Sequence, residues 1–289
     1  MFSIIIPTYN RSKALVRALD SLIKQNYKTF EVIVADDGSS DDTQDVIKNF
    51  EDKLNLKYVW NPNWGGPARP RNIAANLAKN DWLCFLDADD FYYPEKLSIL
   101  RSYLIEADYD VLAHSLDIVG EGFEKKGVAT AKEISNTDPF SDLLTNGNKF
   151  PNSGTVVRKA VFEKINGYRE DKRLIAVEDF DLLIRLSRVT NRFKAINQSL
   201  GAYYLGPDQI SGNWQKYIDA NIAVFSDYQR FLDYQSLEES KALENYIIGS
   251  LYFKAGNKSK AKEYFIKTLK GKNLARRIKV IIRILQTCF

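Results

Sequence analysis

The chain has 289 residues, which is enough for one catalytic domain and a smaller addition and excludes a minimal binding module. Its composition, with 45% apolar and 27% charged residues, is typical of a globular protein and excludes a disordered or fibrous one. The net charge of +4 is uneven, because residues 254–289 hold eleven Lys or Arg against one acidic residue and the remainder is acidic overall. An acidic body suits a site that gathers a metal ion, and a basic end suits an anionic surface rather than general nucleic-acid binding.

The sequence also indicates where the protein works. No uncharged apolar run reaches the roughly 18 residues that a membrane-spanning helix needs, and no secretory signal is predicted at the N-terminus. The two cysteines, Cys84 and Cys288, suit a reducing compartment. We therefore expect a cytoplasmic protein.

The first 110 residues alternate short β-branched runs with amphipathic stretches. Strands are predicted at 2–6, 30–35, 57–60 and 82–86, and helices at 12–26, 41–50 and 67–79. Continuous apolar strands separated by helices predict a mostly parallel sheet that is covered on both faces. Ligands of such sheets bind beyond the carboxyl ends of the strands, so we expect the site in the segments that follow the strands.

Three of the four segments that follow the strands are rich in acids, or in basic residues and glycine. The four segments are Pro7-Thr8-Tyr9-Asn10, residues 36–40, residues 65–72 and residues 87–90. Residues two apart in an extended segment point the same way, so Asp87 and Asp89 present two carboxylates to one side. Such a pair suits Mg²⁺ or Mn²⁺, which completes its shell with water and phosphate oxygens. The alternative is that Asp89 and Asp90 cap a helix beginning near Pro94, which leaves Asp87 without a role.

The order and spacing of these segments, followed by Glu178-Asp179, resemble the inverting family 2 glycosyltransferases. The resemblance covers roughly residues 1–205, and Arg71-Asn72 matches an Arg-Asn pair of that family. It implies an α/β fold of the GT-A type, with a mixed, mostly parallel sheet flanked by helices. It also implies a nucleotide-diphosphate sugar as substrate.

The resemblance assigns roles to residues of the nucleotide-binding half. It implies that Thr8 and Tyr9 line the base pocket and that Asp37 accepts a hydrogen bond from the uracil imide. It also implies that Arg71 and Asp87 lie at the nucleotide. Two alternatives stay open, namely helix capping for the segment after residue 36, and a solvated helix face for Arg69 and Arg71.

Glu178-Asp179-Phe180-Asp181 opens a predicted amphipathic helix, where acids are also favoured by the helix dipole. The resemblance implies that Asp179 is the general base, with Glu178 the next choice and Asp181 on the outer face. One base is sufficient, because a metal ion held by Asp87 and Asp89 stabilises the departing diphosphate. The single histidine, His114, follows an apolar run, so we expect a structural or acceptor-side role and no His-based zinc site.

From about residue 213 the pattern becomes all-helical. The spacing of Gly249, Tyr252, Gly256, Ala261 and Phe265 predicts one tetratricopeptide-like helical pair. The last predicted helix has one apolar face, made of Leu274, Ile278, Ile281, Ile282, Leu285 and Phe289, largely opposite Arg276, Arg277, Lys279 and Arg283. Basic amphipathic helices are typical of membrane-surface elements, so residues 274–289 are predicted to bind an anionic membrane. Docking on the chain's own core or on a partner subunit is the alternative.

Together these features predict a metal-dependent inverting glycosyltransferase with a catalytic domain at 1–212 and a helical extension at 213–289. Within the catalytic domain, 1–110 is the nucleotide-binding half and 111–212 the acceptor half. We expect one sugar to pass from a UDP-hexose or UDP-HexNAc to a saccharide or lipid-linked saccharide in surface glycan synthesis, on the inner face of the membrane. A sugar-phosphate nucleotidyltransferase and a non-catalytic nucleotide-sugar-binding scaffold are the alternatives.

Overall fold

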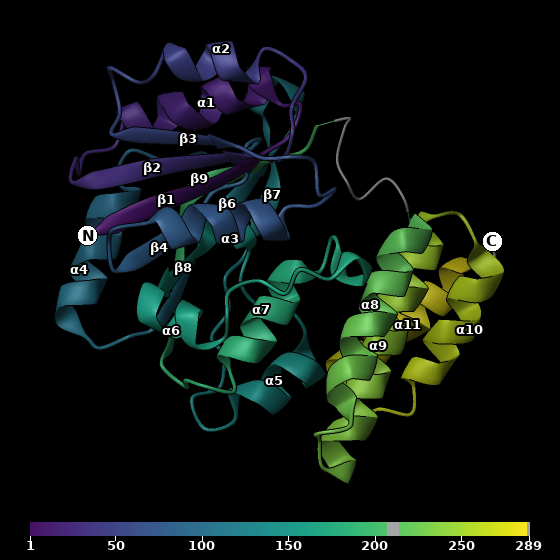
Figure 1. Ribbon diagram of the computed structural model, residues 1–289. Helices are drawn as coiled ribbons and strands as arrows, with labels where there is room; N and C mark the ends of the chain where they lie inside the picture. The colour runs from purple at the N-terminus through teal and green to yellow at the C-terminus, as the bar shows by residue number, and fades with distance from the viewer. Residues whose placement is uncertain (207–213, 288–289) are drawn as a thin grey trace. The chain divides into compact units, whose positions relative to one another are not determined.

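The computed structural model describes residues 1–206 and 214–287 (Figure 1). The chain forms two compact units. The first comprises Met1–Thr137, Lys149–Glu170 and Arg185–Pro207, and the second comprises Asp138–Asn148, Asp171–Ile184 and Asp208–Phe289. The second unit therefore takes in two internal segments besides the C-terminal helices. The predicted boundary between residues 212 and 213 lies outside the described residues.

The first unit is built on a mixed sheet with the strand order β3-β2-β1-β4-β8-β6-β9-β5, and β7 pairs with β6. Four neighbouring strands form one continuous parallel part, namely β1 (Phe2–Thr8), β2 (Phe30–Asp36), β3 (Leu56–Trp60) and β4 (Trp82–Phe85). These are the four strands that the apolar runs predict. The remaining strands are β5 (Phe91–Tyr92), β6 (Val111–Val119), β7 (Lys125–Ala129), β8 (Thr155–Arg158) and β9 (Phe193–Tyr204).

Helices cover both faces of the parallel part. One face, with Phe2, Ile4 and Ile6, shares a core with apolar residues of α1 (Ser12–Ile23), α2 (Thr43–Lys48) and α4 (Lys96–Glu106). The other face, with Ile5 and Ile33 fully buried, carries α3 (Ala68–Leu77) (Figure 1). Burial on both faces explains why these strands are continuously apolar rather than alternating. The helix α6 (Lys159–Lys164) follows β8.

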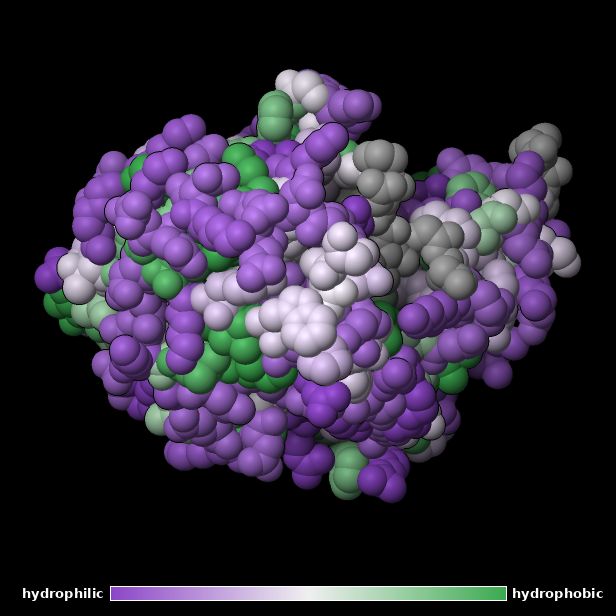
Figure 2. Space-filling model, turned by 45° about the horizontal axis from the view of Figure 1, so that its top comes forward, coloured by the Kyte–Doolittle hydropathy of each residue, from purple (hydrophilic) through white to green (hydrophobic). Residues whose placement is uncertain are grey.

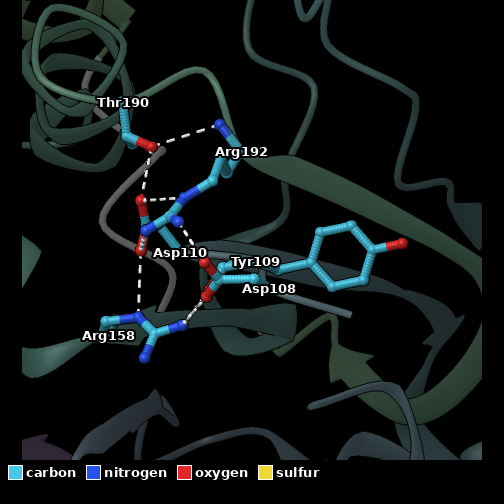
Figure 3. A network of polar contacts seen from close by, with 6 residues as sticks. All are labelled: Asp108, Tyr109, Asp110, Arg158, Thr190 and Arg192. Atoms are coloured by element: carbon cyan, nitrogen blue, oxygen red, sulfur yellow. Dashed lines mark hydrogen bonds and ion pairs between the residues drawn. The ribbon is translucent and has the colours of Figure 1, made fainter. Parts of the chain in front are cut away.

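A polar network joins the ends of β6, β8 and β9 (Figure 3). The carboxylate of Asp110 accepts hydrogen bonds from Arg158 Nε (2.9 Å), from Arg192 Nη2 (2.7 Å) and Nε (2.9 Å), and from Thr190 Oγ1 (2.5 Å). Arg158 lies opposite Trp82 in the sheet and its guanidinium stacks 4.7 Å from the Trp82 ring. The network therefore lies at the edge where the parallel strand β4 begins, away from the predicted site, and its role is structural.

The second unit is helical in its described residues. It holds α5 (Pro139–Asn146), η3 (Lys172–Leu174), most of α7 (Glu178–Leu186), α8 (Trp214–Gln229), α9 (Tyr234–Lys254), α10 (Lys258–Thr268) and α11 (Leu274–Thr287). Its core contains Ile218, Ile248, Leu251, Tyr252, Ala261, Phe265 and Val280. The predicted all-helical C-terminal region and its helical pair, α9 and α10, are confirmed. Gly249 lets the two helices approach, because a Cβ there would lie 2.8 Å from the Phe265 ring.

The last helix, α11, leaves its apolar stripe outside the core of its unit. Val280 is fully buried and Arg276 is 8% exposed, and Arg276 donates hydrogen bonds to the carbonyls of Thr145 and Glu239. By contrast, every predicted apolar residue that is described is more than half exposed, namely Leu274, Ile278, Ile281, Ile282 and Leu285. Phe289 lies outside the described residues.

The surface is otherwise largely hydrophilic on the face drawn in Figure 2, with apolar side chains in small separate patches. Among the described residues, no helix is long and apolar enough to cross a membrane.

Candidate active site

The predicted site segments meet at the carboxyl edge of the parallel strands. Thr8 pairs with Asp36 in the register of β1 and β2, and Asp36 pairs with Trp60 in β3. Asp87 and Asp89 follow β4, whose Phe85 pairs with Ile5. The order of the strands thus brings residues from separate parts of the first unit to one edge, as predicted from the strand pattern.

Asp37 orders the loop that follows β3. Its Oδ1 accepts a hydrogen bond from Trp64 N–H, and its Oδ2 accepts one from Gly65 N–H, each at 2.9 Å. The side chain of Asn63 adds a 2.7 Å hydrogen bond to the Asp37 carbonyl. Asp37 is only 4% exposed. In this structure its carboxylate therefore shapes the Gly65 turn, where φ is +92°.

The two residues predicted for the base pocket differ in exposure. Thr8 is buried, and its Oγ1 has no hydrogen-bond partner among the described residues. Tyr9 is 48% exposed. A buried hydroxyl without a partner is costly, so Thr8 Oγ1 is an atom for which a ligand could supply the partner.

Asp87 is held by hydrogen bonds to three side chains. Its Oδ1 accepts hydrogen bonds from Arg71 Nη2 (2.6 Å) and Asn152 Nδ2 (3.0 Å). Its backbone N–H donates to Ser153 Oγ (3.1 Å). Its Oδ2 accepts no hydrogen bond from the described residues. One oxygen of Asp87 is thus occupied by the protein, and the other is left for a ligand.

Asp89 brings a second negative charge to the same place. Burial raises the pKa of Asp89, and the charge of Asp87 raises it further. The Asp89 carbonyl accepts a hydrogen bond from Arg17, whose guanidinium lies 4.0 Å from the centre of the Tyr204 ring. Two partly buried carboxylates that repel each other are a site that a cation would stabilise.

The donor set fits a hard divalent cation. The described residues contain no group of three or more His, Cys, Asp or Glu side chains that could hold a metal ion. Asp87 Oδ2 and the Asp89 carboxylate are two oxygen ligands, which is the number that Mg²⁺ or Mn²⁺ takes when water and phosphate complete its shell. A metal that needs a full set of protein ligands, such as structural zinc, does not fit.

Asp90 is structural rather than a helix cap. It is 1% exposed, its Oδ2 accepts a hydrogen bond from Ser153 Oγ (2.5 Å), and its Oδ1 accepts one from Tyr204 N–H (3.0 Å). The next helix, α4, begins only at Lys96, with Glu95 at its N-cap. The capping alternative for Asp89 and Asp90 is therefore wrong.

The two arginines of α3 have different surroundings. Arg71 is 3% exposed and reaches Asp87, so a solvated helix face does not describe it. Arg69 is exposed, with its Nε 3.4 Å from an oxygen of Glu170. Asn72, next to Arg71, forms two 2.8 Å hydrogen bonds with the backbone N–H and C=O of Tyr168.

The acidic residues at the start of α7 belong to the second unit. The carboxylate of Asp179 accepts hydrogen bonds from Asn148 Nδ2 (2.9 Å) and Phe180 N–H (2.8 Å), and Asp179 is partly exposed. Glu178 is 7% exposed, and its Oε2 accepts a 2.8 Å hydrogen bond from Ala176 N–H. Glu178 therefore supports the turn at Ala176, where φ is +82°.

The prediction that Asp181 lies on the outer face of α7 is wrong. Asp181 is fully buried, and its Oδ1 accepts a 2.7 Å hydrogen bond from the hydroxyl of Tyr228 in α8. The helix α8 covers this side of α7 within the second unit, which the local periodicity of residues 178–186 does not show.

His114 and Lys96 are buried behind the site. Burial, followed by the nearby charge of Lys96, holds the pKa of His114 well below its usual value. Burial also lowers the pKa of Lys96 to about 7. His114 is 0% exposed, which agrees with a structural role and leaves no surface for a nucleophilic mechanism.

Sequence reasoning missed Asn152, Ser153 and Tyr168, which contact the Asp87–Asp90 segment directly or through one another. Tyr168 lies outside every segment that the sequence predicts for the site. No spacing rule links Asn152 to Asp87, because 65 residues separate them.

Comparison with known protein families gives a family model that matches this chain. The model of "Glycosyl transferase family 2" matches residues 3–166, more than half of the chain. The matched region includes every predicted site residue of the first unit.

Two curated relatives illustrate the range of the family. The chain is 32% identical over 206 residues to poly(ribitol-phosphate) beta-N-acetylglucosaminyltransferase TarS of Staphylococcus aureus. This alignment covers 70% of this chain and 35% of TarS. It is 29% identical over 294 residues to the amylovoran biosynthesis glycosyltransferase AmsB of Erwinia amylovora, in an alignment that covers 94% of this chain and 96% of AmsB. The chain thus spans about a third of the length of TarS and nearly all of AmsB.

Solved structures share the fold. The crystal structure of S. aureus TarS 1-349 in complex with UDP-GlcNAc matches with a TM-score of 0.67 and 20% identity, covering 99% of this chain and 90% of that chain. The mannosyltransferase PcManGT from Pyrobaculum calidifontis, in complex with GDP-Man and Mn²⁺, matches with a TM-score of 0.58 and 15% identity, covering 100% and 80%. These likenesses confirm the predicted GT-A type fold with C-terminal helices.

Proposed function

Since the chain belongs to glycosyl transferase family 2, we propose that it moves one sugar, with inversion, from a nucleotide-diphosphate sugar to a saccharide or lipid-linked saccharide acceptor. The proposed donor is a UDP-hexose or UDP-HexNAc, and the proposed role is surface glycan synthesis. TarS is named for transfer to poly(ribitol-phosphate) and AmsB for amylovoran biosynthesis, and both names support a role in the synthesis of a polymer. The UDP-GlcNAc complex of TarS supports the donor.

One observation carries the proposal. Asp87 and Asp89 lie together at the carboxyl edge of the parallel strands, and Arg71 occupies only one oxygen of Asp87. This arrangement leaves a negative site for a divalent cation beside the edge where a nucleotide would bind. The Mn²⁺ in the PcManGT structure supports a metal in this fold.

Asp87 and Asp89 are the proposed ligands of Mn²⁺ or Mg²⁺, and the cation when bound would neutralise charge on the departing diphosphate. Asp179 is the proposed base. Its carboxylate accepts the proton of the acceptor hydroxyl while the hydroxyl oxygen bonds to the anomeric carbon and the bond from that carbon to the phosphate oxygen breaks. The oxygen enters opposite the leaving group, so the anomeric configuration inverts. Asp179 suits this role better than Glu178, because Glu178 is buried and its carboxylate accepts a hydrogen bond from the Ala176 N–H.

Donor binding and slow donor hydrolysis test the proposal without a known acceptor. Titration calorimetry with UDP-GlcNAc, UDP-glucose and GDP-mannose, with Mn²⁺ or with EDTA, should show metal-dependent binding of a UDP-sugar. Proton NMR of the first hydrolysis product should show the inverted anomer. Preference for GDP-mannose, or a retained configuration, would contradict the proposal.

A pair of variants tests the metal ligands. Asp89→Ala should abolish metal-dependent donor binding and leave the fold intact. The matched control is Asp45→Asn, since the side chain of Asp45 is 73% exposed on α2 and pairs with the exposed Lys48. Unchanged affinity and turnover in Asp89→Ala, with metal still required, would remove this carboxylate from the metal site.

The proposed location of the protein is the inner, anionic face of the membrane, to which α11 would attach it. The exposed apolar stripe of that helix adjoins the exposed basic residues Arg277 and Lys279. Each Lys or Arg near an anionic leaflet contributes about 1 kcal/mol, and apolar side chains add to it. Deleting the whole helix would also remove Val280 and Arg276, which pack within the unit, so substitutions in the stripe are the better test.

Two surface variants separate charge from apolar contact. Arg277→Gln with Lys279→Gln should weaken binding to vesicles of phosphatidylglycerol by about 2 kcal/mol, or roughly 30-fold, and salt should have the same effect. Ile278→Ser with Ile281→Ser should weaken binding further, whereas Ile266→Ser on α10 should not. Full-length protein that ignores these vesicles at low salt would refute the location.

A further inference from the structure

Asp87 belongs to a closed ring of four side chains. Arg71 Nη2 and Asn152 Nδ2 both donate to Asp87 Oδ1, at 2.6 Å and 3.0 Å. The hydroxyl of Tyr168 donates to Asn152 Oδ1 at 3.0 Å. The ring closes because the Arg71 guanidinium lies 5.1 Å from the centre of the Tyr168 ring. Tyr168 therefore contacts both donors of the carboxylate without touching the carboxylate.

Tyr168 is itself held on every side. It is 1% exposed, and its ring packs edge-on against Phe85, the last residue of β4, with centroids 5.2 Å apart at 82°. Asn72 fixes its backbone through two 2.8 Å hydrogen bonds. Gly167 precedes it with φ +67°, and a Cβ at Gly167 would lie 2.5 Å from Asn72 Oδ1. Tyr168 thus connects α3 to β4, the strand that precedes Asp87.

The hydroxyl of Tyr168 decides which way the Asn152 amide faces. A carboxamide has an acceptor oxygen on one side and a donor nitrogen on the other. Because the Tyr168 hydroxyl donates to the oxygen, the nitrogen faces Asp87 Oδ1. The opposite orientation would place an oxygen against the carboxylate, which is repulsive. Asp87 Oδ1 is consequently kept on the protein side, and Oδ2 is the oxygen without a partner among the described residues.

We propose that Tyr168 is a positioning residue that acts through Asn152 to aim Asp87 Oδ2 at the divalent cation. This inference rests on the proposed function, which assigns Asp87 to the metal. Side chains that orient a metal ligand without touching the metal change metal affinity by about 10- to 100-fold when they are removed. Tyr168→Phe deletes only the hydroxyl and keeps the ring against Phe85 and Arg71.

The test is Mn²⁺ binding, measured by electron paramagnetic resonance of free Mn²⁺ in the presence of UDP. Tyr168→Phe and Asn152→Ala should each raise the Kd of Mn²⁺ by about 10- to 100-fold. The double variant should be no worse than Asn152→Ala, because the two residues act in series. The matched control is Tyr93→Phe. The Tyr93 hydroxyl donates to Asp117 at 3.0 Å, so its removal should leave the Kd of Mn²⁺ unchanged.

Turnover at saturating Mn²⁺ should fall less than Mn²⁺ affinity does in both single variants, a split that loss of fold would not produce. If Asp87→Asn weakens Mn²⁺ binding but folded Tyr168→Phe and Asn152→Ala stay within twofold of the parent, the positioning role is overturned and the metal site stands. If the two single effects add in the double variant, action through Asn152 is overturned. If Asp87→Asn leaves Mn²⁺ binding unchanged, the proposed metal site fails and this inference fails with it.

Discussion

Replacing Asp110 by Asn should lower the free energy of unfolding by about 2–4 kcal/mol at neutral pH. The carboxylate of Asp110 is almost fully buried and accepts four hydrogen bonds, three from Arg158 and Arg192 and one from Thr190 (Figure 3). Asn keeps one acceptor oxygen and turns N–H groups toward the remaining donors. Two lost charge-assisted hydrogen bonds would cost about 3–6 kcal/mol, and partial solvation of the arginine side chains, 31% and 44% exposed, lowers that cost.

The matched control is Asp108→Asn. Asp108 pairs with the same two arginines, but its side chain is 68% exposed, so its loss should cost less than about 1 kcal/mol. Urea unfolding followed by circular dichroism measures both variants. The melting temperature of Asp110→Asn should fall by roughly 5–15 °C, since 1 kcal/mol shifts a protein of this size by a few degrees.

The pH dependence of the free energy of unfolding tests the role of Asp110 independently. Burial alone would raise the pKa of Asp110, but hydrogen bonds from Arg192, Thr190 and Arg158 outweigh burial and hold that pKa below its usual value. The stabilisation is therefore present above the unfolded pKa, about 4, and is lost as pH falls through the folded pKa. The deficit of Asp110→Asn should shrink below about pH 4. An Asp110→Asn variant no less stable than Asp108→Asn at pH 7 would refute this reasoning.

Three other predictions follow from the described contacts. Asp179→Asn should lower turnover by roughly 10²–10⁴-fold with donor affinity unchanged in calorimetry, and an inactive but folded Glu178→Gln beside an active Asp179→Asn would reverse the assignment. Burial lowers the pKa of Lys96 to about 7, so between about pH 7 and 10.5 the unfolded chain binds more protons than the folded chain and the free energy of unfolding should rise with pH. In urea titrations at pH 6.5 and 9, Lys96→Met should show a smaller rise than the parent protein. An equal rise in both proteins would contradict the burial effect. Gly249→Ala should lower the melting temperature although Ala favours helices, because the Ala Cβ would lie 2.8 Å from the Phe265 ring, at a cost of about 1–3 kcal/mol. An unchanged or higher melting temperature would show that α9 and α10 move apart freely.

The sequence alone determined the parallel half of the sheet and the edge where the site lies. Continuous apolar runs ending in polar segments predicted β1 to β4, and the structure confirms all four. The reason is local: the spacing of apolar residues and the residues that end each run are read directly along the chain. The same holds for α9 and α10, whose small and aromatic residues alternate at helical spacing.

The boundaries of the helices were less accurate. The helix predicted at 41–50 spans only Thr43–Lys48, because Asp41 is used to bind Ser12 N–H and Thr43 N–H. A side chain that bonds to a backbone group outside the helix changes where the helix begins, and its partner at Ser12 is far away in sequence.

Only the tertiary structure decided which polar groups pair. Asp37 was expected at the base, and its carboxylate is bound by the backbone of Trp64 and Gly65. Asp181 was expected outside, and Tyr228 covers it. Asn152 donates a hydrogen bond to Asp87 from 65 residues away. Helical and strand periods depend on neighbours in sequence, whereas the partner of a buried polar side chain depends on which distant segment the topology brings against it.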